Sequence, residues 1–248
     1  MLDSHLIVKT SPIAFGDNVT IWKNIRITVL SNTLFRIEKD SKKSFCDSAT
    51  QAVWFRNMPV VKYSVEAGVR SVNICTNRAT LTVKENVMNS TVTVDGKEIL
   101  LEKVKNLPGA YRSLDCCDGE MYKTKLSPTA TRIRLDDGIV SKCGVGLYDD
   151  TASLLLGEDG RLHERNDDEL DLYVFAHGSD YRGALRDLYM ISGSVPMIPR
   201  YALGNWWSRY HAYSDKEYLH LLDKDAYFCN AFKGRNEFAL GKKEQKGR

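Results

Sequence analysis

The sequence predicts a mainly β fold, in which an antiparallel β-sandwich is followed by a linker helix and the start of an α/β domain. Two observations predict it. From residue 19 to about residue 180, short segments alternate apolar with polar side chains and are separated by turn residues, as in half-buried antiparallel strands. After Gly178 the apolar residues recur three or four positions apart, which is the spacing of a helix.

The expected strands follow one another at short intervals. Ser31 and Asn32 supply the turn between the second and third strands, and Asp95-Gly96 predicts a hairpin because this pair suits a two-residue primed turn. Regularly spaced strands with turns between them favour a sandwich. The expected strands cover residues 19–22, 25–30, 34–38, 69–74, 79–83, 91–94, 97–100, 144–148, 153–156 and 170–176.

A helix is expected over residues 180–192, with Asp180 as its N-cap and Gly193 just after its end. A proline-containing connector follows. Residues 201–207 then read as a buried strand and residues 215–224 as a helix that begins with a capping box. One strand and one helix are a single unit of an α/β fold, and such a unit cannot bury its own strand on both faces. The predicted domains are a sandwich over 1–179, a helix and linker over 180–200, the α/β start over 201–224 and an aberrant or disordered basic tail over 225–248.

Composition argues against several classes of protein. The formal net charge of +3 over 248 residues is too small for a dedicated nucleic-acid binder, although the tail over 233–248 is basic and could attach loosely to polyanions. None of the six cysteines forms a C-x-x-C pair, so neither a metal site nor another cofactor is predicted. No stretch approaches the roughly 20 apolar residues of a membrane span, and no signal peptide is recognisable. The protein is therefore predicted to be cytoplasmic.

Several segments, in matching order, resemble the N-terminal region of family 31 glycoside hydrolases. Residues 50–56 (TQAVWFR) resemble the Thr-Gln-x-Val-x-x-Arg segment of that family, and residues 137–144 resemble its Gly-Leu-Leu-Ser-x-x-Gly turn. Residues 174–181 (VFAHGSDY) match the last eight positions of its Tyr-x-Phe-x-x-Gly-x-Asp-Tyr segment. The run from Gly193 to Leu222 looks like the start of the catalytic barrel, and the resemblance covers about residues 15 to 224.

The resemblance implies a galactose-mutarotase-like sandwich followed by the truncated start of a (β/α)₈ barrel. It also implies a retaining α-glycosidase that acts on terminal α-linked glucose or xylose. Such chemistry needs two carboxyl groups about 5–5.5 Å apart, and in the family both are aspartates on later barrel strands, one in a Trp-x-Asp segment that is absent here. A barrel needs roughly 250 residues. The chain is therefore expected to be an N-terminal fragment without catalytic residues, inactive alone. The paired acids at 136–137, 149–150 and 167–168 are expected to be solvated turn residues.

The resemblance implies that this chain contains part of a sugar-binding subsite, although it lacks the catalytic residues. Aromatic faces suit the C–H side of a pyranose, and a guanidinium donates hydrogen bonds to its hydroxyl groups. For Trp206 and Trp207 the competing interpretation is that they belong to the barrel core. For the loop over 112–119, which contains Asp115, it is a surface turn. The expected partners are an α-linked oligosaccharide or glycoside and the remaining part of the barrel. The candidate substrate-binding residues are Trp206, Trp207, Arg209, Tyr210 and Asp115.

Two other functions compete with this one. The chain could be a non-catalytic carbohydrate-binding or interaction module that uses a face of the sandwich together with Trp206 and Trp207. Nucleic-acid binding through the basic tail ranks third.

Overall fold

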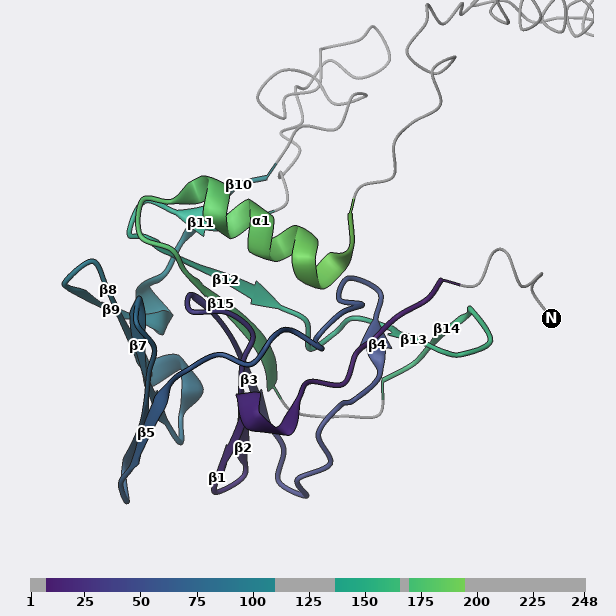
Figure 1. Ribbon diagram of the computed structural model, residues 1–248, viewed down its shortest axis with the longest axis horizontal. Coiled ribbons are helices and arrows are strands. Elements are labelled where there is room, and N and C mark those ends of the chain that lie inside the picture. Colours follow the sequence, from purple (N-terminus) through teal and green to yellow (C-terminus); the bar gives the residue numbers. More distant parts are fainter. Residues whose placement is uncertain (1–7, 110–136, 166–169, 195–248) are drawn as a thin grey trace, which may run out of the picture. The chain divides into compact units, whose positions relative to one another are not determined.

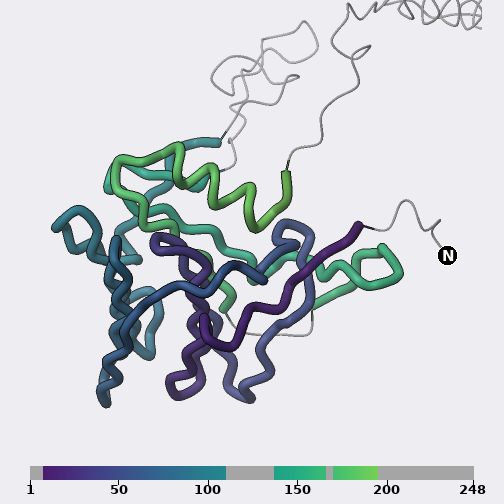
Figure 2. Tube along the Cα trace, in the orientation of Figure 1, coloured from purple at the N-terminus to yellow at the C-terminus, as the bar shows by residue number. Residues whose placement is uncertain are grey.

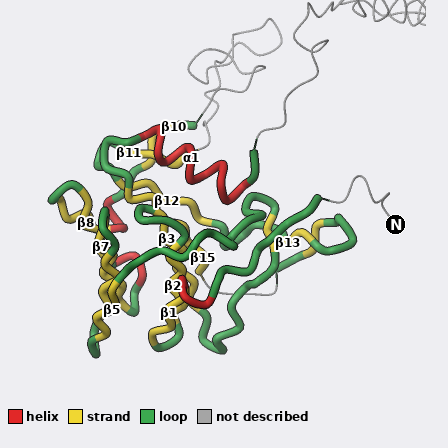
Figure 3. The backbone as a smooth tube through the Cα atoms, in the orientation of Figure 1, coloured by secondary structure: helices red, strands yellow, loops and turns green. Residues whose placement is uncertain are grey.

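The computed structural model describes residues 8–109, 137–165 and 170–194 (Figure 1). The chain divides into two compact units, Met1–Ser194 and Val195–Arg248, and every described residue belongs to the first. All pairs of named strands in the described part are antiparallel, and one α-helix follows them. Figure 3 shows this dominance of strands over helix. The predicted fold class, an antiparallel β-sandwich followed by a helix, is confirmed.

The first large sheet, here called the central sheet, has the strand order β1-β2-β3-β15-β12. Its first three strands are consecutive in the chain, whereas β15 is the last strand of the described part and lies between β3 and β12. The strands are β1 (Val19–Trp22), β2 (Ile25–Val29), β3 (Leu34–Lys39), β12 (Val145–Asp149) and β15 (Leu170–Ala176).

The second large sheet, here called the meander sheet, joins five consecutive strands side by side. Its last hairpin turns at Asp95 and Gly96, whose φ angles of 50° and 73° are the left-handed values that a primed turn requires. The strands are β5 (Ser64–Ala67), β6 (Ser71–Cys75), β7 (Ala79–Lys84), β8 (Thr91–Val94) and β9 (Lys97–Leu100).

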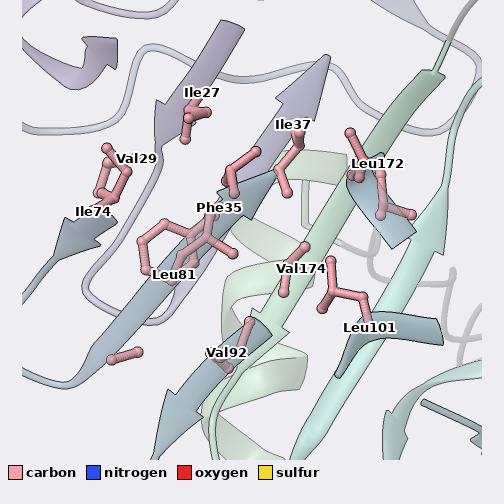
Figure 4. Close-up of a cluster of buried hydrophobic side chains, with 14 of the residues drawn as sticks. Ile27, Val29, Phe35, Ile37, Ile74, Leu81, Val92, Leu101, Leu172 and Val174 are labelled. Carbon is pink, nitrogen blue, oxygen red and sulfur yellow. The ribbon is translucent and has the colours of Figure 1, made fainter. Parts of the chain in front are cut away.

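The main hydrophobic core lies between the two sheets (Figure 4). Alternate residues of the inner strands point into it, because successive side chains of a strand face opposite sides of the sheet. The labelled side chains of Figure 4 come from the central sheet (Ile27, Val29, Phe35, Ile37, Leu172, Val174), from the meander sheet (Ile74, Leu81, Val92) and from the 3₁₀ turn Leu101–Lys103 (Leu101).

The other face of the central sheet, here called the outer face, is also covered. Helix α1 (Tyr181–Ser192) and the segment over residues 46–58 contribute to a second apolar cluster with that face. Residue 11 of the N-terminal segment forms a parallel bridge with residue 55, so these two stretches run side by side (Figure 2). The cluster contains Leu30, Leu34, Val53, Met58, Tyr173, Phe175, Ala184 and Ile191.

Short strands and 3₁₀ turns complete the described part. β4 (Ala49–Thr50), β13 (Leu155–Leu156) and β14 (Leu162–His163) form a small three-stranded sheet. β10 (Asn106–Pro108) pairs with β11 (Asp137–Ser141). The remaining 3₁₀ turns are Gly16–Asn18 and Val87–Asn89. No helix among the described residues is long and apolar enough to cross a membrane.

Helix α1 begins and ends where the sequence predicts. The carboxylate of Asp180 accepts a hydrogen bond of 2.9 Å from the backbone N–H of Gly183, as an N-cap does. Gly193 ends the helix with a φ of 93°, a conformation that favours glycine.

The ten expected strands are all present, with ends that differ by no more than two residues. Five strands of the structure were not expected from the sequence, namely β4, β5, β10, β11 and β14. β5 has no buried face and so shows no alternation, while β4 and β14 contain only two residues each. Residues 137–144 were expected to form a turn, because they resemble one of family 31 enzymes, but β11 is a strand that leads into a turn. The strand and helix expected over 201–224 lie outside the described residues.

Candidate functional site

The sequence-predicted sugar subsite lies outside the residues that the structure describes. This holds for Trp206, Trp207, Arg209 and Tyr210 and also for Asp115. Within the described residues, polar and charged side chains are buried at the outer face of the central sheet. They form two groups. The charged cluster consists of Arg26, Arg36, Glu38, Arg165 and Asp171, and the histidine cluster consists of Ser31, Thr33, His177 and Asp187.

A two-pronged ion pair lies at the centre of the charged cluster. Arg36 Nε donates to Asp171 Oδ1 at 2.8 Å and Arg36 Nη2 to Asp171 Oδ2 at 2.7 Å. Arg36 is only 2% exposed and Asp171 is fully buried. Arg165 Nη2 donates a further hydrogen bond of 2.8 Å to Asp171 Oδ2. The register of β3 and β15 places these side chains on one face, since Glu38 lies opposite Asp171.

The charged cluster holds the backbone of Cys46 from both sides. The carbonyl oxygen of Cys46 accepts hydrogen bonds of 3.1 Å from Arg36 and from Arg26. The N–H of Cys46 donates to Glu38 Oε1 at 3.1 Å, and Glu38 is itself bound by Arg26 at 2.7 and 2.9 Å. Charge-assisted bonds of this kind are stronger than neutral ones. These bonds hold Cys46, at the start of the segment over residues 46–58, against the central sheet without strand pairing.

Two buried aspartates, Asp171 on β15 and Asp150 just after the end of β12, have opposite pKa shifts. Burial alone would raise the pKa of Asp171, but attraction to Arg36 and hydrogen bonds from it lower the pKa to about 2. Burial raises the pKa of Asp150, and the negative charge of Asp171 adds to the rise. Opposite shifts in a pair of carboxyl groups are typical of acid–base catalysis. Both groups are fully buried, however, and both are bound by protein donors, so the structure supports a stabilising role for them.

The burial of Asp150 corrects one expectation. The acid pair at 149–150 was predicted to be solvated, yet only Asp149 is exposed. Asp150 Oδ2 accepts a 2.8 Å hydrogen bond from Thr50, and its Oδ1 accepts a 3.2 Å bond from Tyr148. Asp137 is exposed as expected, and the acids at 136 and 167–168 lie outside the described residues.

The histidine cluster joins the end of β15 to α1. His177 Nε2 lies 3.0 Å from Asp187 Oδ2 and 3.0 Å from Thr33 Oγ1. Ser31 donates a 2.6 Å hydrogen bond to the same carboxylate oxygen. A nucleophilic serine would instead lie within hydrogen-bond distance of the histidine that takes its proton. The Ser31 hydroxyl is directed at the carboxylate and not at the histidine. The cluster therefore does not have the arrangement of a catalytic triad, and its hydrogen bonds hold α1 against the central sheet.

The segments that resemble family 31 enzymes meet one another at the outer face. Arg56 Nε donates to the hydroxyl of Tyr173 at 2.7 Å, and Arg56 Nη1 donates to the carbonyl of Ser48 at 2.8 Å. The N–H of Gly178 donates to the carbonyl of Gly144 at 2.9 Å, where Gly144 has a φ of 91° and a Cβ would lie 2.9 Å from the Gly178 Cα. These residues therefore fasten parts of the fold that are distant in sequence.

Sequence reasoning missed the charged cluster. Arg36 and Glu38 alternate with apolar residues in β3, which is also the pattern of a solvent-facing strand side. The available signal was Asp171, which interrupts the apolar strand β15 that was expected to be buried. A carboxylate there needs a basic partner.

A shallow groove of about 500 Å³ lies beside β3 and the 3₁₀ turn Val87–Asn89. Its basic and acidic groups are already engaged, because Lys39 Nζ donates to the carbonyl of Glu85 at 3.1 Å and the Glu85 carboxylate pairs with Lys23. The groove therefore presents no free acid–base pair. Its lining residues are Lys39, Glu85, Asn86, Val87, Met88 and Leu170.

Comparisons with known proteins gave matches among solved structures. No family profile and no curated protein matches the sequence. Two structures of a GH31 dextranase from Flavobacterium johnsoniae are similar to it, one of a mutant complexed with isomaltotriose and one complexed with glucose. Each is 16% identical in sequence, with TM-scores of 0.43 and 0.42. The similarity covers 76% of this chain but only 27% of the dextranase chain. The dextranase belongs to the family that residues 50–56 and 174–181 resemble.

Proposed function

We propose that the described sandwich is the non-catalytic N-terminal domain of a retaining α-glycosidase of family 31, and that this 248-residue chain does not hydrolyse glycosides alone. One observation carries the proposal: the three family-like segments within the described part converge at the outer face of the central sheet. Residues 50–56 contact β15 through Arg56 and Tyr173, and Gly144 and Gly178 join the other two segments.

The proposed inactivity is supported by the burial and hydrogen bonding of Asp150 and Asp171. The pair with opposite pKa shifts, Asp150 and Asp171, is fully buried and bound by protein donors, so neither carboxylate is accessible to a glycosidic bond. In the proposed intact enzyme, the part of a barrel that starts at residues 201–224 would meet the rest of that barrel. Trp206, Trp207, Arg209, Tyr210 and Asp115 would contact a terminal α-linked glucose or xylose.

The test is an activity assay on the purified chain with p-nitrophenyl α-glucoside, p-nitrophenyl α-xyloside and isomaltose. We expect no turnover above the buffer blank. An active α-glucosidase added to the same mixture serves as the control that the chain does not inhibit the assay. Turnover whose specific activity stays constant through two further columns would show that the chain is itself an enzyme and would refute the proposal.

Sugar binding is measured separately, by titrating tryptophan fluorescence with isomaltose or maltose. A fragment with an incomplete subsite is expected to show no saturable change at high millimolar sugar. A saturable change that is lost in Trp206→Phe or Trp207→Phe would instead favour the carbohydrate-binding module.

A further inference from the structure

Helix α1 presents an outward face with an unusual composition. Ala184 and Ile191 are buried, and the six exposed residues of the helix include neither an acidic residue nor a lysine. The exposed apolar residues are substantially open to solvent, at 44% for Tyr181, 44% for Leu185, 47% for Tyr189 and 37% for Met190. The α1 face, as it is called below, consists of Tyr181, Arg182, Leu185, Arg186, Tyr189 and Met190.

This composition is that of a protein–protein interface. Tyrosine, methionine and arginine are enriched in interfaces, whereas lysine, glutamate and aspartate are depleted there. A helix face that only meets water carries charged and polar residues. Tyr181, Leu185 and Tyr189 are four positions apart and so form one continuous stripe. The α1 face is thus suited to contact another protein surface.

The charges of the α1 face indicate the chemistry of the partner. Arg182 and Arg186 are one turn apart, about 6 Å along the axis, and no carboxylate in the described ranges pairs with either. The acidic residues of this part of the chain are engaged elsewhere, because Asp187 is turned inward to His177 and Asp180 caps the helix. A second copy of the same face would place four guanidinium groups together, so a twofold contact is disfavoured.

We propose that the α1 face is the docking surface for an acidic amphipathic helix of a partner protein. Two carboxylates one turn apart on that helix would pair with Arg182 and Arg186, and its apolar side chains would cover Tyr181, Leu185 and Tyr189. The 12-residue length of α1 sets the contact at about 18 Å. This inference is independent of the proposed glycosidase relationship, because it depends only on the exposed residues of one helix.

The experiment uses the full chain and two fluorescently labelled helical peptides of about 16 residues, roughly 24 Å long. One peptide has leucines spaced three and four residues apart and flanked by glutamates, and the other has lysines in place of the glutamates. Binding is followed by fluorescence anisotropy at about 50 mM and about 500 mM salt, which screen charges to different degrees. We expect the glutamate peptide to bind at least about fivefold more tightly at low salt, and the preference to shrink at high salt.

Charge reversal supplies the matched controls. Arg182→Glu with Arg186→Glu should invert the preference, so that the lysine peptide binds more tightly. Arg70→Glu with Arg78→Glu changes the net charge equally at exposed turns of the meander sheet and should leave the preference unchanged. Circular dichroism melts check that each variant folds, and the comparison of the two peptides on the unaltered chain needs no variant.

Three results would overturn the proposal. The first is no binding of the glutamate peptide, or equal binding of both peptides. The second is an equal effect of the control variant, which would mean that only net charge matters. The third is a dimer in light scattering that Leu185→Glu dissociates, since this would assign the α1 face to a second copy of the chain.

Discussion

At the scale of single residues, the ion pair of Arg36 and Asp171 links stability to pH. The pKa of Asp171 is about 2 in the folded chain and about 3.9 when unfolded, so the pair stabilises the fold above pH 4 and loses this contribution as the pH falls towards 2. We predict that Asp171→Asn lowers the free energy of unfolding at pH 7 by about 3–5 kcal/mol, because it removes one of the two carboxylates that balance the buried charge of Arg36. Urea denaturation at pH 7, 4 and 2.5 should show this difference narrowing with acid.

Asp150→Asn is the matched comparison. Burial raises the pKa of Asp150, so this residue contributes stability below its unfolded pKa and loses it as the pH rises through the folded value. Asp150→Asn should therefore lower the free energy of unfolding at pH 7 by less than Asp171→Asn does. Below pH 4 the effect of Asp150→Asn should grow relative to that of Asp171→Asn. Equal pH profiles for the two variants would contradict the opposite pKa shifts.

At the scale of elements, β11 and β12 can lie in close contact because Gly146 on β12 has no side chain. A Cβ at Gly146 would overlap the carbonyl oxygen of Ile139 on β11. We predict that Gly146→Ala lowers the free energy of unfolding by about 1–3 kcal/mol, because the two strands must separate. Gly16 has open space around its Cα and no positive φ. Gly16→Ala should therefore change the free energy of unfolding by less than about 0.5 kcal/mol. Equal effects in a urea titration would show that the strands adjust without cost.

Most of the elements that the sequence predicted have at least one buried face. In β7, buried and half-buried residues alternate, and the prediction is correct to within one residue. β5 carries no such signal, because every residue of this edge strand is exposed. The clusters at the outer face were not predictable from periodicity, since Arg36 and Asp171 are 135 positions apart and only the strand register brings them together.

At the scale of the described unit, stability should vary with position in the sheets. β3 and β15 each pair on both sides, whereas β5 and β9 are edge strands of the meander sheet. Amides in buried, doubly paired strands open only with global unfolding, while edges open locally. We predict that hydrogen exchange followed by mass spectrometry is slowest in peptides from β3 and β15 and faster by orders of magnitude in β5. Faster exchange in β15 than in β5 would contradict the observed strand order.

The position of β15 also has a consequence for synthesis on the ribosome. About 130 residues separate the end of β3 from the start of β15, its neighbour in the sheet. At roughly 5–20 residues per second, the ribosome needs on the order of 10 s to synthesise these residues. During this interval the free edge of β3 has no native strand to pair with, and neighbouring nascent chains on the same messenger offer identical edges. A holding chaperone that binds residues 25–39 in this window would prevent such pairing and raise the yield of folded protein.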